Sequence, residues 1–80
     1  MDQARRERLR EIIRFLESAQ SDVGDILLGE EAAFESRHAP SRETQLGQIS
    51  KDAIDSLSNA VDDIESAITN LRDAIGDESP

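Results

Sequence analysis

One heptad repeats three times between Ala53 and Ile75, where the chain reads AIDSLSN AVDDIES AITNLRD AI. An alanine returns every seven residues, a β-branched residue follows it, and a leucine or isoleucine stands three positions later. In heptad notation these columns are g (Ala53, Ala60, Ala67, Ala74), a (Ile54, Val61, Ile68, Ile75) and d (Leu57, Ile64, Leu71). A strict seven-residue period is typical of a helix that packs along another helix in a left-handed supercoil. The small alanines narrow one side of this seam, so a neighbouring backbone can approach closely there.

The first part of the chain has the apolar spacing of a second long helix, which we predict over residues 3–34. Asp2 is well placed to cap its start. Ile13, Leu27 and Phe34 lie beside the main apolar series and widen it into a face suited to a bundle core. That series advances in alternating steps of three and four residues and is interrupted by Glu30. Its members are Leu9, Ile12, Leu16, Ala19, Val23, Ile26 and Ala33.

A loop over residues 35–41 is expected to join the two helices, because Pro40 cannot continue a helix. Ser41 can cap a helix over 42–75, Gly76 supplies its C-terminal stop, and residues 76–80 form a tail. Two helices of matched length with a short link favour an antiparallel arrangement. The sequence therefore predicts one all-α domain, residues 1–80, folded as a coiled-coil-like helical hairpin.

Small size favours self-association of this hairpin. A chain of 80 residues without cysteine has no disulfide to stabilise it, and a hairpin has only one seam. Two hairpins that form a four-helix bundle would bury more apolar surface, so we predict a homodimer. Phe15 and Leu28 lie off the main series, and with the g-column alanines they are the predicted self-association residues.

The charge balance is acidic, with 18 Asp and Glu residues against 9 Lys and Arg, a net charge of −9. Such a chain is repelled by nucleic acid and by anionic membranes, although Arg5, Arg6, Arg8, Arg10 and Arg14 gather near its start. We expect no direct nucleic-acid binding, no membrane contact and a cytoplasmic location. Acidic helix faces suit a protein partner with a basic surface, and the predicted partner-binding residues are Asp55, Asp62, Asp63, Glu65 and Asp73.

Little in the sequence points to catalysis. The four glycines are scattered, so no phosphate-binding loop is present, and a helical hairpin offers no evident pocket for a nucleophile. Glu35 and His38 match the Glu-x-x-His spacing of di-iron helix bundles, which leaves a metal-binding bundle as a minor alternative. We predict no enzyme activity, no catalytic residue and no cofactor.

Several short strings resemble a family of small, uncharacterised two-helix proteins carried by bacteria, phages and mobile elements. They are Ala4-Arg5-Arg6-x-x-Leu9 with Ile12-Ile13, Glu30-Glu31 with Phe34 and Pro40-Ser41, and the heptads from Ala53 to Leu71. Ala39 departs from the asparagine that family members place before the proline. The resemblance implies no activity, but it favours an accessory protein of phage–host conflict. The expected function is thus an acidic interaction module, such as an anti-CRISPR-like anti-defence inhibitor, with a structural or assembly adaptor as the alternative.

Overall fold

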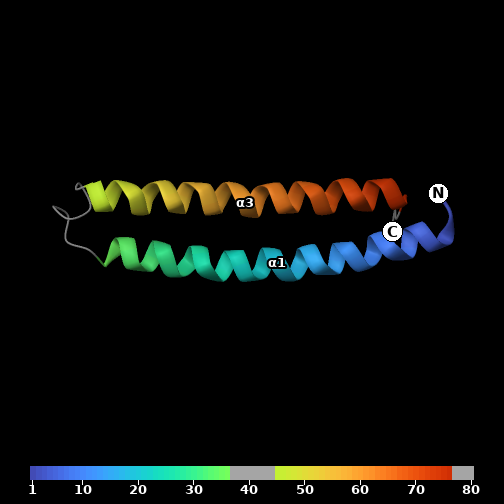
Figure 1. Ribbon diagram of the computed structural model, residues 1–80, viewed down its shortest axis with the longest axis horizontal. Helices are drawn as coiled ribbons and strands as arrows, with labels where there is room; N and C mark the ends of the chain where they lie inside the picture. Colours follow the sequence, from blue (N-terminus) through green and yellow to red (C-terminus); the bar gives the residue numbers. More distant parts are fainter. Residues whose placement is uncertain (37–44, 77–80) are drawn as a thin grey trace.

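Two long helices lie side by side and run in opposite directions in the computed structural model of the chain (Figure 1). The structure describes residues 1–36 and 45–76. Helix α1 spans Gln3–Glu35 and helix α3 spans Gln45–Ile75. The start of α1 and the end of α3 lie at the same end of the rod, which confirms the predicted antiparallel helical hairpin.

The helix ends follow from local side-chain chemistry. Asp2 caps α1, since its carboxylate accepts a hydrogen bond of 2.8 Å from the Arg5 backbone N–H. Gly76 adopts a φ of +73°, and its N–H bonds the carbonyls of Arg72 and Asp73, as expected of a glycine that ends a helix. Both ends were predicted from the sequence.

The boundaries next to the loop differ slightly from those predicted. Glu35 belongs to α1 and not to the loop, because the N–H and the hydroxyl of Ser36 both bond the Ala32 carbonyl and complete the last turn. Helix α3 begins at Gln45 as described, and the predicted start at Arg42 lies outside the described residues.

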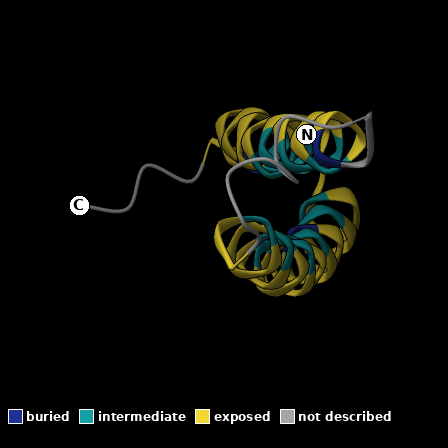
Figure 2. Cartoon of the chain, turned by 90° about the vertical axis from the view of Figure 1, so that its left-hand side faces the viewer, coloured by how far each residue is buried: buried dark blue, intermediate teal, exposed yellow. Residues whose placement is uncertain are grey.

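The a and d columns of α3 form the seam with α1, as the heptads predict. Ile68 at the centre of the a column is 1% exposed, and Ile75 is also buried. Figure 2 looks along the rod and shows the less exposed surfaces of the two helices turned toward each other. The seam therefore holds the hairpin together by burying aliphatic side chains.

The residues of α1 that pack in the seam differ from the predicted main series, because every second member is shifted by one residue toward the C-terminus. Ile12 and Ile26 are exposed, whereas Ile13 is buried and Leu27 and Phe34 are half-buried. Two interleaved three–four series share Leu9, Leu16, Val23 and Glu30, and the structure uses the one that also contains Ile13, Gln20, Leu27 and Phe34. That choice exchanges one isoleucine for another and Ile26 for Leu27, and it places Gln20 in the seam instead of Ala19. Its gain in apolar area comes from Phe34, which is half-buried in place of Ala33.

The core is concentrated at one end of the rod. Buried Ile13, Ile68 and Ile75 pack with the half-buried side chains of Leu9, Leu16, Ile64 and Leu71, all from the half of the rod where α1 begins and α3 ends. Toward the loop the described hydrophobic side chains are at most half-buried, and Glu30 occupies a seam position of α1. Among the described residues, the loop half of the hairpin thus has fewer buried aliphatic side chains.

Replacing Glu30 with leucine is expected to stabilise the hairpin by about 1 kcal/mol, because leucine completes the apolar series at a half-buried position. Thermal unfolding followed by circular dichroism should show a midpoint about 4–8 °C higher. Glu31→Leu is the matched control, since it removes the same charge at an exposed neighbouring position. An equal gain in both variants would mean that lower net charge, and not the seam, causes the effect.

Candidate functional site

The hairpin has two long sides of different chemistry, one on each flank of its seam. We call one the acidic side; it carries Glu17, Glu31, Glu35, Asp55 and Glu65, together with the cations Lys51 and Arg72. The other, the apolar side, carries Ile12, Ala19, Ile26 and Ala33 of α1 and Ile49, Ala53, Ala60 and Ala67 of α3. Within each helix, the residues of a set repeat at multiples of seven or lie next to residues that do. Each side therefore extends along the length of the rod.

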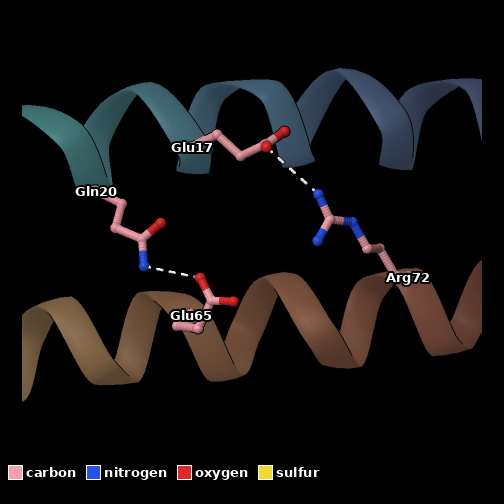
Figure 3. A network of polar contacts seen from close by, with 4 residues as sticks. All are labelled: Glu17, Gln20, Glu65 and Arg72. Atoms are coloured by element: carbon pink, nitrogen blue, oxygen red, sulfur yellow. Dashed lines mark hydrogen bonds and ion pairs between the residues drawn. The ribbon is translucent and has the colours of Figure 1, made fainter.

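Polar contacts cross the seam on the acidic side (Figure 3). Arg72 Nη2 lies 3.3 Å from Glu17 Oε2, and both side chains are about half exposed. Gln20 Nε2 donates to Glu65 Oε2 at 2.9 Å and to the Val61 carbonyl at 3.3 Å. An exposed ion pair contributes at most about 1 kcal/mol, so these contacts set the register of the helices more than their stability.

A shallow groove opens on the acidic side near the loop end of the rod. Phe34 and Ile54 supply its apolar floor, and Lys51 is the cation beside it. Three carboxylates surround this floor, from Glu31, Glu35 and Asp55. Carboxylates around an apolar floor suit a lysine or arginine side chain, whose stem packs on apolar atoms while its charged head meets the carboxylates.

The five aspartates and glutamates predicted to bind a partner are all exposed, but they do not form one patch. Asp55 lines the groove, Asp62 lies one heptad farther along α3, and Glu65 accepts the hydrogen bond from Gln20. Asp63 lies next to the alanine column, toward the apolar side, and Asp73 lies on the outer face of α3. Sequence reasoning did not predict Glu31 and Glu35 as partner-binding residues. Their spacing of one helical turn is visible in the sequence, but their approach to Asp55 depends on the register of the two helices.

The apolar side contains a second shallow groove. Ile26 and Glu30 of α1 line it together with Ile49, Ala53 and Leu57 of α3. Ile26 is 57% exposed and Ile49 is 56% exposed. Large aliphatic side chains with this exposure from two helices form a continuous surface that the hairpin itself leaves uncovered.

The residues predicted for self-association are distributed over both sides. Phe15 is 79% exposed and flanks the apolar side, three residues after Ile12. Leu28 is 66% exposed and shares the seven-residue column of Arg14 and Glu35, toward the acidic side. The alanine column flanks the seam: Ala53, Ala60 and Ala67 are half-buried, while Ala74 is exposed.

Glu35 and His38 are the candidates for the metal-binding alternative. Glu35 is exposed at the end of α1, and His38 lies outside the described residues. Within residues 1–36 and 45–76, no three metal-ligating side chains gather at one place. Neither α1 nor α3 is long and apolar enough to cross a membrane.

Comparison with known proteins adds no relative to this description. No family model, curated protein or solved structure matches this chain. The resemblance to small two-helix proteins of bacteria and phages therefore stays a prediction.

Proposed function

We propose that this protein is a non-enzymatic interaction module that self-associates through its apolar side and binds a basic partner protein through its acidic side. The separation of these two surfaces on opposite flanks of one seam is the observation that supports the proposal. In its concrete version the protein acts in the cytoplasm as an anti-defence inhibitor of the anti-CRISPR kind, which occupies a nucleic-acid channel of its target.

Charge and shape support binding to a basic channel. The rod is 57 Å long, and the chain has a net charge of −9. A channel that binds nucleic acid carries lysine and arginine residues along its length to neutralise phosphates. An acidic rod attracts the same residues and competes with the nucleic acid for them.

The groove lined by Glu31, Glu35 and Asp55 is the proposed anchor point for one basic side chain of the partner. Three carboxylates and one lysine line the groove, so its formal charge is negative. An arginine that enters the groove can stack on Phe34 and pair with the remaining carboxylates. This combination distinguishes the groove from the isolated acidic side chains elsewhere on α3.

Reversing the charge of the groove is expected to weaken partner binding at least tenfold. The test variant combines Glu31→Lys, Glu35→Lys and Asp55→Lys, and it serves as bait beside the wild-type protein in affinity capture from the host cell. Captured proteins are identified by mass spectrometry, and the affinity of the principal one is then measured at several salt concentrations. Binding to the wild-type chain should weaken steeply as salt rises.

The matched control reverses three exposed carboxylates outside the groove, with Glu11→Lys, Asp25→Lys and Asp52→Lys. Both variants have the same net charge, so a general loss of attraction affects them equally. Equal weakening in both, or an affinity indifferent to salt, contradicts the proposed anchor.

A structural adaptor is the second candidate function, and the exposure of Leu28 on the acidic flank favours it. An adaptor of this kind binds its partner through apolar contact, and its acidity serves solubility. Leu28→Ser then weakens binding while the charge reversal in the groove does not, so the two variants separate the two functions.

A further inference from the structure

We infer that the apolar side binds a second copy of this chain whose rod runs in the opposite direction, so that α1 packs on α1 and α3 packs on α3. The inference rests on the proposed self-association and adds the surface and the direction of the pairing. Ile12, Ala19 and Ile26 of α1 would lie at its centre together with Ala60 and Ala67 of α3.

The two flanks of the seam differ in the side chains that they expose. The apolar side exposes Ile12, Ile26 and Ile49, with Phe15 at its edge. The opposite flank carries the Glu17–Arg72 ion pair and the Gln20–Glu65 hydrogen bond (Figure 3). Covering that flank removes charged groups from water at a cost of several kcal/mol for each ion left poorly paired. Covering the apolar side removes mainly aliphatic side chains from water, together with the half-buried carboxylate of Glu30.

The hairpin exposes more surface than a compact monomer of the same mass. The chain exposes 5972 Å², against about 4,800 Å² for a compact monomer of its mass. A stable dimer buries roughly 800 Å² per partner. The excess exposed area is therefore of the size that a second copy covers.

Side-chain sizes along the apolar side suit a close contact between two copies. Alanine alternates with isoleucine along the α1 column at Ile12, Ala19, Ile26 and Ala33, and the α3 column is alanine throughout. Small residues let two helix backbones approach closely, and the isoleucines can fill the space between them. When two copies are reversed about Ala19, Ile12 of one lies level with the partner's Ile26. The column thus matches its own reverse, with an isoleucine pair on either side of an alanine pair.

Charge is distributed unevenly along the rod. The loop half of the rod, residues 22–36 and 45–58, contains seven carboxylates and one lysine. In the terminal half, residues 1–21 and 59–76, eight carboxylates are nearly balanced by six arginines. Parallel rods would place the two acidic loop halves together. Reversed rods place each loop half beside the partner's arginines, and this difference sets the direction.

Spin-label distances test the direction, because the chain has no cysteine and accepts single labels. Ala32→Cys and Ser18→Cys introduce labels on the exposed outer face of α1, one far from the expected centre and one near it. At 1.5 Å rise per residue, reversed rods place the two Ala32 labels about 40 Å apart or slightly more. The two Ser18 labels then lie within about 25 Å of each other across helices packed 8–10 Å apart.

Pulsed electron paramagnetic resonance measures both distances, and light scattering of the same samples measures molar mass. A dimer with short distances at both positions means parallel rods and overturns the direction. A dimer with long distances at both positions means contact through the rod ends and overturns the surface. A monomer up to high concentration, with α-helical circular dichroism retained, overturns the proposed self-association itself.

Discussion

Ile68→Ala is expected to destabilise the hairpin by about 3 kcal/mol and to leave it largely unfolded near 37 °C. Ile68 is 1% exposed and stands at the centre of the only tightly packed cluster in the described part of the chain. Truncating a buried isoleucine to alanine costs about 2–5 kcal/mol, through the lost burial and the cavity that remains. A single core in a chain of 80 residues supplies only about 3–5 kcal/mol. The substitution thus removes most of the available stability.

Urea titration followed by helical circular dichroism measures this loss. Leu28→Ala is the matched control, because it removes a large aliphatic side chain at a position that is 66% exposed. Substitutions at such surface positions usually change stability by less than about 0.5 kcal/mol. If the two variants lost stability equally, the seam described here would not be the source of the stability.

The seam of α3 was predictable from the sequence because a single series is available there. Ile54, Val61, Ile68 and Ile75 repeat at seven residues, and no competing series offers comparable apolar area. The seam of α1 was not predictable in this way, because two apolar series of α1 share the same leucines. Choosing between Ile12 and Ile13 depends on where the partner helix lies, and that information is absent from α1 itself.

The acidic groove could likewise not be predicted from the sequence of either helix alone. Exposure of individual carboxylates follows from their heptad positions, so Asp55 and Asp62 were correctly expected to be accessible. Their grouping with Glu31 and Glu35 depends on the register of the antiparallel pair. Gln20 contributes to that register by donating hydrogen bonds to the Val61 carbonyl and to Glu65. No local sequence pattern in either helix predicts these bonds.

The two proposed surfaces are compatible in one assembly. When the apolar sides of two copies meet, their acidic sides point away from each other on opposite faces of the bundle. Each groove with Glu31, Glu35 and Asp55 then stays open to solvent, and a dimer presents two of them. Two anchor points on one rigid body raise the effective affinity for a target with repeated basic sites.

The double variant Ile12→Glu with Ile26→Glu is expected to be monomeric and to weaken self-association at least 100-fold, equivalent to about 2.7 kcal/mol. In reversed rods each new carboxylate faces its counterpart on the other copy, so four acids meet in a surface that must lose its water. Both isoleucines are exposed in the single hairpin, so the variant should keep its α-helical circular dichroism.

Thermal midpoints at several protein concentrations distinguish this effect from simple destabilisation. The wild-type midpoint should rise with concentration, because association stabilises the folded state by mass action. The midpoint of the double variant should not change. Ser18→Glu with Ala32→Glu adds the same charge on the exposed outer face of α1, and it should keep the concentration dependence of the wild type. If that control also lost the dependence, net charge would govern association, and the apolar side would have no special part in it.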